Sequence, residues 1–85
     1  MRLVMGFEHV DDDGDTWQYQ VMELPSLGRL QLWFKQPGQD WVWGHSKEIP
    51  AGSTAEGVAN LMRLFVQGEL SYETYNQVLP LPMKA

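Results

Sequence analysis

Hydrophobic and polar residues alternate along the first half of the chain, with the period of two that is typical of β-strands. The alternation begins near Leu3, resumes at Trp17 after a polar interruption, and resumes again near Leu30. A shorter stretch of the same kind covers residues 40–44, so the pattern predicts four strands. The positions expected to share one covered face of the first three strands are Leu3, Met5, Phe7, Trp17, Tyr19, Val21, Leu30, Leu32 and Phe34.

Short turn-forming segments separate these predicted strands. Residues 11–15 contain Asp-Gly, which is a strong hairpin signal. Residues 25–28 contain Pro and Gly, and Pro37-Gly38 fits the two central positions of a type II turn. Parallel neighbours would need crossovers of about a dozen residues or more. The short loops therefore predict an antiparallel meander over residues 1–44.

The periodicity changes from strand to helix after Gly52. The sequence Ser53-Thr54-Ala55-Glu56 matches a capping box, in which we expect the Ser53 hydroxyl to accept from the backbone. A helix over residues 54–67 follows, and Gly68 is expected to end it. Its apolar stripe, which we expect to cover the sheet, consists of Ala55, Val58, Leu61, Met62 and Phe65.

A second, shorter helix is predicted over residues 71–79, with Ser71 as its N-cap and with Pro80 and Pro82 beyond its end. The Gly-x-Leu-Ser-x-Glu-x-Tyr pattern at residues 68–75 is similar to a helical hairpin of many unrelated bacterial proteins. We therefore predict one α+β domain over residues 1–85. It has a four-stranded antiparallel meander (1–44) packed against a C-terminal helix, which forms a helical hairpin (53–79) with the short second helix.

Composition and charge change the range of partners that we expect. The 85 residues include no cysteine, and their net charge is −5 with a pI near 4.7. The six basic residues are scattered singly, whereas nucleic-acid and membrane-surface binding need clustered cations. We therefore expect neither partner. The missing cysteines and the short, early-charged N-terminus, which does not resemble a signal peptide, favour a soluble cytoplasmic protein.

The acidic loop at residues 11–15 is the first candidate for a binding site. Asp11, Asp13 and Asp15 alternate as they do at the start of a calcium loop, but the glycine and glutamate of that pattern are missing from their places. A solvated hairpin turn is the simpler interpretation, with a weak divalent-ion site, which His9 could join, as the alternative. A second alternative is that the acidic protein imitates a nucleic acid and occupies the binding site of a partner.

Catalytic patterns are weakly represented. His45 and Ser46 are adjacent, but neighbours on an extended chain point to opposite faces. The sequence contains no nucleophile elbow, phosphate-binding loop or dinucleotide fingerprint. We therefore expect a protein that is not an enzyme and needs no cofactor. A small hydrolase or metal-dependent enzyme stays as an alternative.

The high tryptophan content is the feature of the composition that says most about function. Trp33 lies between the inward positions Leu32 and Phe34, so it should point away from the predicted helix. Tryptophan and arginine are enriched in binding hot spots, although ordinary packing is the alternative. We therefore predict a non-catalytic module, of the kind found among bacterial and phage accessory proteins, that binds a larger protein partner or self-associates through an aromatic sheet face. The residues predicted to form that surface are Trp33, Trp41, Trp43, Arg29, Gln31 and Lys35.

Overall fold

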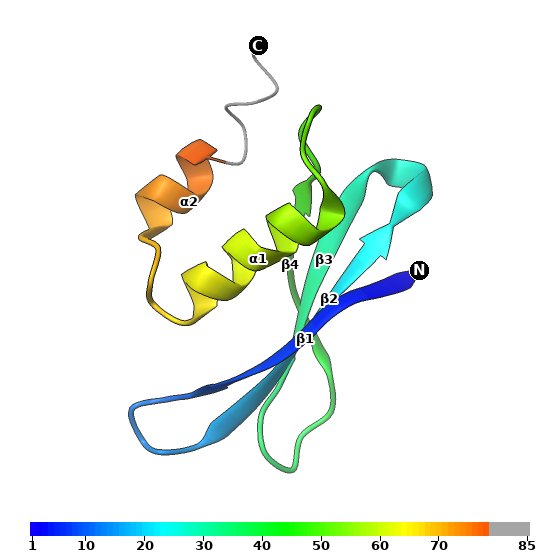
Figure 1. Cartoon of the computed structure of the whole chain (residues 1–85). Helices are drawn as coiled ribbons and strands as arrows, with labels where there is room; N and C mark the ends of the chain where they lie inside the picture. Colours follow the sequence, from blue (N-terminus) through cyan, green and yellow to red (C-terminus); the bar gives the residue numbers. More distant parts are fainter. Residues whose placement is uncertain (79–85) are drawn as a thin grey trace.

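A four-stranded sheet and two helices make up the part of the chain that the structure describes (Figure 1). The computed structural model describes residues 1–78, and it confirms the predicted α+β fold. Leu79, Pro80 and Pro82, which were expected at the end of the second helix, lie outside the described residues. The elements in chain order are β1 (Arg2–Val10), β2 (Thr16–Leu24), the 3₁₀ turn η1 (Pro25–Leu27), β3 (Arg29–Lys35), β4 (Val42–Glu48), α1 (Ala55–Val66) and α2 (Tyr72–Val78).

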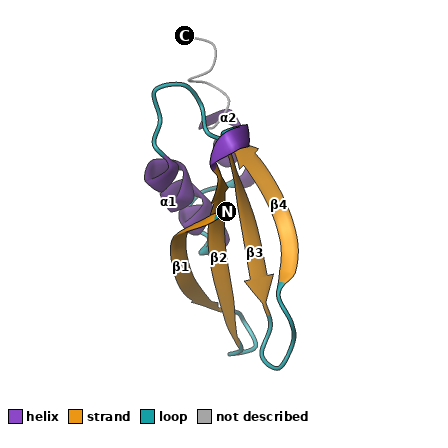
Figure 2. Ribbon diagram, turned by 90° about the vertical axis from the view of Figure 1, so that its right-hand side faces the viewer, coloured by secondary structure: helices purple, strands orange, loops and turns teal. Residues whose placement is uncertain are grey.

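The strands pair antiparallel in the order β1-β2-β3-β4, which is the predicted meander (Figure 2). The turns follow the predicted chemistry. Gly38, at φ 75°, occupies the third position of the Pro37-Gly38 turn, and the amide of Gln39 donates to the Gln36 carbonyl at 3.1 Å. These tight turns explain why each strand lies beside its neighbour in sequence.

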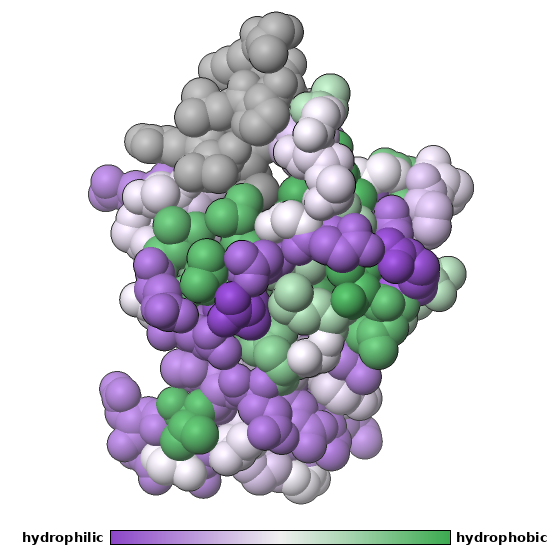
Figure 3. Space-filling model, in the orientation of Figure 1, coloured by the Kyte–Doolittle hydropathy of each residue, from purple (hydrophilic) through white to green (hydrophobic). Residues whose placement is uncertain are grey.

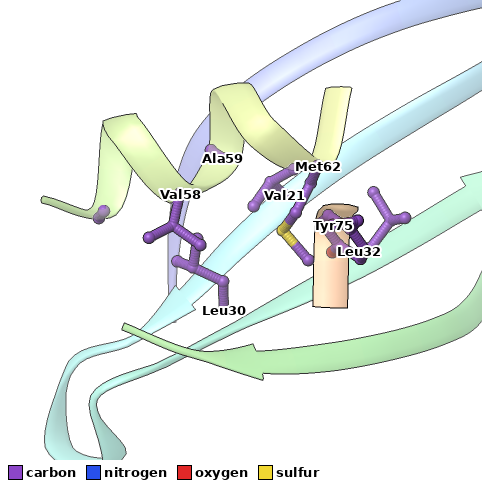
Figure 4. Packing of buried hydrophobic residues seen from close by; sticks show 8 residues of the cluster. Val21, Leu30, Leu32, Val58, Ala59, Met62 and Tyr75 are labelled. Carbon is purple, nitrogen blue, oxygen red and sulfur yellow. The ribbon is translucent and has the colours of Figure 1, made fainter. Parts of the chain in front are cut away.

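Helix α1 crosses one face of the sheet, in contact with β1 and β3. The core lies between this helix and the sheet, and Figure 4 shows Val58 above Leu30 and Tyr75 beside Leu32. The residues of the buried hydrophobic cluster are Val21, Leu30, Leu32, Ala55, Val58, Ala59, Met62 and Tyr75, and Pro50 is buried as well. Phe65, which was expected in this core, is only half-buried and stacks on Tyr75 with ring centroids 4.4 Å apart.

The two ends of α1 were predicted with different success. The N-cap is Thr54 rather than Ser53, because the Thr54 hydroxyl accepts from the amide of Gly57 at 3.0 Å. Glu56 consequently does not close a capping box, and its carboxylate lies 3.5 Å from the Arg2 guanidinium. The predicted stop is confirmed. Gly68 has φ 78°, and the next amide donates to the Leu64 carbonyl, as in a Schellman motif.

One residue of the predicted covered face is misplaced by a β-bulge. The register between β1 and β2 shifts between Leu3 and Met5, so Leu3 pairs with Met22 while Met5 pairs with Val21. An extra residue in one strand reverses the facing of the residues on one side of it. Leu3 is therefore 52% exposed on the opposite face, and Val4 packs against the core instead.

Strand β4 lies later in the sequence than predicted, at Val42–Glu48 instead of residues 40–44. The side chains of its C-terminal half that face the helices are polar, so hydrophobic alternation does not identify this half as a strand. Two of them hold α2. The Tyr75 hydroxyl lies 3.0 Å from Nε2 of His45, and Lys47 Nζ donates to Oδ1 of Asn76 at 2.8 Å.

The His45–Tyr75 contact predicts a pH dependence of stability. Burial, and secondarily the charge of Lys47, lower the pKa of His45 below its ordinary value of 6.5. A histidine with a lowered folded pKa binds its proton more readily when unfolded, so its contribution to stability is present above pH 6.5 and is lost as the pH falls through the folded pKa. We therefore expect urea denaturation to show a loss of stability between about pH 7 and pH 5.

The His45→Gln variant should lose less stability than the parent over the same interval, because glutamine does not titrate. Equal slopes for the parent and His45→Gln would contradict the assignment of this titration to His45.

Candidate functional site

The open face of the sheet is defined here as the side chains of β1–β4 that point away from α1. Strand alternation and the observed register place Arg29, Gln31, Trp33 and Lys35 of β3 on this face, because Leu30 and Leu32 between them are buried under α1. Figure 3 shows the other side of the molecule. There apolar side chains gather around the middle, and the end that carries the β1–β2 and β3–β4 loops is mostly hydrophilic.

Of the three predicted surface tryptophans, Trp33 and Trp43 lie on the open face, and Trp41 borders it from the loop before β4. Trp33 and Trp43 are directly opposite each other on β3 and β4. Trp33 is half-buried and its indole N–H donates to Oε1 of Gln31 at 3.2 Å, whereas Trp43 is 52% exposed. Trp41 precedes β4 and is 37% exposed. It borders a shallow hollow with the open-face residue Gln20, so it reaches over β2.

A second β-bulge, at Gly44, turns Trp43 outward. The register shifts between Leu32 and Trp33, so that His45 faces Leu32 while Trp43 faces Trp33. Without the extra residue, Trp43 and His45 would share the face covered by α1. A Cβ at Gly44 would lie 3.1 Å from the Leu32 carbonyl oxygen, so the backbone approach at the bulge favours glycine.

Polar groups surround the indoles. The Arg29 guanidinium lies 3.2 Å from the Glu48 carboxylate and donates to the Ser46 hydroxyl at 2.9 Å. Lys35 shares the face with these residues. Exposed ion pairs of this kind contribute only about 0–1 kcal/mol to stability, so their main effect here is to orient Arg29. The predicted surface residues therefore do come together on one face.

The acidic loop is organised around its first aspartate. One Oδ atom of Asp11 accepts from the amides of Asp13 and Asp15 at 2.9 Å each, and the other accepts from the Trp17 indole at 2.8 Å. These hydrogen bonds, that of Trp17 foremost, lower the pKa of Asp11. The carboxylate thus closes the hairpin loop. Within residues 1–78, no three His, Asp or Glu side chains are grouped so that they could hold a metal ion.

His45 and Ser46 do point to opposite faces, as predicted. His45 turns toward Tyr75 on the side of the helices, and the Ser46 hydroxyl accepts from Arg29 on the open face. Sequence reasoning missed the polar cluster of His45, Lys47, Tyr75 and Asn76. Its only sequence signal is the continuation of strand alternation from His45 to Glu48, in which the inward positions are polar.

Comparison with protein families gives one match. The family model described as Mycobacterium phage L5 gene 74 protein matches residues 5–81. Neither a curated protein nor a solved structure was found to match the chain. Over the part of the chain that is described, neither helix has the length and apolar character needed to cross a membrane.

Proposed function

Because this chain belongs to the Mycobacterium phage L5 gene 74 protein family, we propose that it is a non-catalytic phage accessory protein of the cytoplasm. Its proposed role is to bind a larger protein, or a second copy of itself, through the open face. The observation that supports this proposal best is the gathering of Trp33, Trp41 and Trp43 at the sheet face that the helices leave uncovered.

The energetic argument rests on the exposed indoles. Trp43 and Trp41 keep 52% and 37% of their surface accessible to water, although each could bury a large apolar area against a partner. Interface hot spots are enriched in tryptophan and arginine and have a polar rim around them. Trp43 beside Trp33, with Arg29 and Lys35 on the same face, has this composition.

The charge distribution of the open face supports a protein partner that is not strongly charged. The strand residues of the open face carry two cations, Arg29 and Lys35, and two carboxylates, Glu8 and Glu48, so their formal charges cancel. The whole chain has a net charge of −5. Another protein, including a second copy of this chain, can therefore approach this face without the repulsion that the rest of the surface would cause.

We expect the Trp43→Ala variant to weaken binding by about 2 kcal/mol or more, which is roughly a thirtyfold increase in Kd, while unfolding free energy changes by less than about 1 kcal/mol. Sedimentation velocity over a range of concentrations measures self-association. Titration of proteins captured from a host lysate, each then purified, measures binding to a larger partner.

The control is Tyr72→Ala, since Tyr72 is an aromatic side chain that is 68% exposed on α2, away from the open face. It should bind as the parent does. If Trp43→Ala and Trp33→Ala both keep the parental affinity for every partner and for self-association, the open face is not the binding surface.

The acidic-decoy alternative makes a different prediction in the same titrations. Binding would then weaken steeply with salt and would be lost when Asp12, Asp13 and Asp15 are changed to asparagine. Trp43→Ala would have little effect. This result would assign the interaction to the acidic loop and not to the indoles.

A further inference from the structure

A hollow of about 280 Å³ lies between β4, the C-terminal part of α1, and α2. It is separate from the open face, because His45 and Lys47 of β4 enter it from the side of the sheet that carries the helices. The helices contribute Phe65, Tyr72, Tyr75 and Asn76 to its lining. Its size is near the lower end of small-ligand sites.

Aromatic rings form one wall of this hollow. Phe65 and Tyr75 are stacked with an interplanar angle of 5°, and the Tyr72 ring centroid is 6.1 Å from that of Phe65. Tyr72 is largely exposed, so it lies at the entrance. The Lys47 ammonium lies 4.8 Å from the Tyr75 ring centroid, as in a cation–π contact. The cation position over this ring is therefore already occupied by the protein itself.

Hydrogen-bond donors predominate among the polar groups. Lys47 Nζ donates one hydrogen to Asn76 Oδ1 at 2.8 Å, and an ammonium carries three. The side-chain NH₂ of Asn76 and the other ammonium hydrogens have no protein acceptor among the residues described. The Tyr75 hydroxyl is directed at Nε2 of His45 at 3.0 Å.

The charge of the hollow is opposite to that of the chain. None of the lining residues is acidic, and Lys47 is the one charged side chain among them. Arg2 and Arg29 form ion pairs with glutamates, but within residues 1–78 no carboxylate lies within 4.0 Å of Lys47. Lys47 is therefore a half-buried cation that has no ion-pair partner within residues 1–78 and lies beside the side-chain amide of Asn76.

We propose that this hollow binds a carboxylate attached to an apolar or aromatic group, with the carboxylate on Lys47 and Asn76 and the apolar part against Phe65 and Tyr72. A single ammonium matches one negative charge, whereas phosphate groups are usually held by several cations or by a row of backbone amides. A cationic ligand would be repelled by Lys47. The C-terminal residue of a peptide and a free aromatic carboxylic acid both have the required chemistry.

The experiment is an NMR titration of the ¹⁵N-labelled full chain with two acids. N-acetyl-L-phenylalanine represents a peptide C-terminus, and benzoate represents a free aromatic acid. We expect saturable shifts of the backbone amides of residues 45–47 and 72–76, with a Kd of about 1 mM for the preferred acid. Tighter binding of the first acid assigns the site to peptide C-termini, and tighter binding of benzoate assigns it to small aromatic acids.

Removing either charge should weaken this binding about tenfold or more. N-acetyl-L-phenylalaninamide removes the charge from the ligand and leaves the folded protein unchanged, so it keeps the test valid if variants are unstable. Lys47→Gln removes it from the protein, and Lys35→Gln on the open face is the matched control that should bind as the parent does. Equal affinity for the acid and its amide, or no saturable shift with either acid, would overturn the proposal.

This test is independent of the proposed function. Trp43→Ala should leave the binding of the acids unchanged, and Lys47→Gln should leave self-association and the open-face partner unchanged. Shifts confined to the amides of the open face would also overturn the proposal, because the acids would then occupy the surface around the indoles.

Discussion

The Tyr75→Ala variant is expected to lose about 3–5 kcal/mol of unfolding free energy, the range observed when large buried aromatic side chains are truncated. Tyr75 is 2% exposed, and it is the buried residue among positions 72–76 of α2, the part of this helix whose burial is described. The variant loses the stacking on Phe65 and leaves Nε2 of His45 without its hydroxyl partner. A domain of this length has about 4–13 kcal/mol in total, so a substantial part of its stability is at stake.

Urea denaturation followed by circular dichroism measures this loss. Tyr72→Ala removes the same type of side chain from the same helix, but Tyr72 is 68% exposed, so the expected change is within about 0.5 kcal/mol. Tyr75→Phe keeps the ring and removes the hydroxyl, at a cost of about 1–3 kcal/mol. If Tyr75→Ala were as stable as Tyr72→Ala, α2 would not be part of the cooperative core.

The Leu30→Ala variant should lose about 2–5 kcal/mol, because it leaves a cavity between β3 and α1. Leu30 is fully buried on β3, directly under Val58 of α1 (Figure 4). For a domain of this size, each 1 kcal/mol lowers the melting temperature by about 4–8 °C. A thermal melt should therefore show a decrease of about 8 °C or more.

Leu27 provides a matched control three residues earlier in the sequence. It belongs to η1 and is 65% exposed, so Leu27→Ala removes the same atoms from a largely exposed position. Its melting temperature should stay within a few degrees, about 4 °C, of that of the parent. Similar losses for the two variants would mean that the contact between α1 and β3 does not carry the stability assigned to it.

Secondary-structure elements were predicted well where the hydrophobic pattern and the turn residues of the same segment define where the element begins and ends. The first three strands alternate hydrophobic and polar residues, with an interruption in β1 at the Val4 bulge, and α1 has an apolar stripe and a glycine stop at Gly68. The meander order followed because turns such as Pro37-Gly38 are too short for any other connection. For the candidate site, alternation alone placed Trp33 outward with Arg29, Gln31 and Lys35, because Leu30 and Leu32 had to face the helix.

Local patterns failed where the backbone conformation or the pairing of two strands decides the outcome. Capping depends on backbone angles that a four-residue pattern does not specify, and Thr54 rather than Ser53 adopts them. The bulges at Val4 and Gly44 are properties of strand pairing, so neither the exposure of Leu3 nor the facing of Trp43 relative to His45 can be read from one strand alone.

The hydrophobic pattern of the sequence changes from a two-residue period to the period of an α-helix. This pattern by itself determined the antiparallel meander, the helix that covers it, and which residues of β3 face away from that helix. Only the tertiary structure decided where β4 ends and how α2 is held, because the inward positions His45 and Lys47 are polar and their partners, Tyr75 and Asn76, are about 30 residues away. Hydrophobic periodicity indicates which apolar residues are buried. It does not indicate which polar groups are buried because another segment of the chain completes their hydrogen bonds.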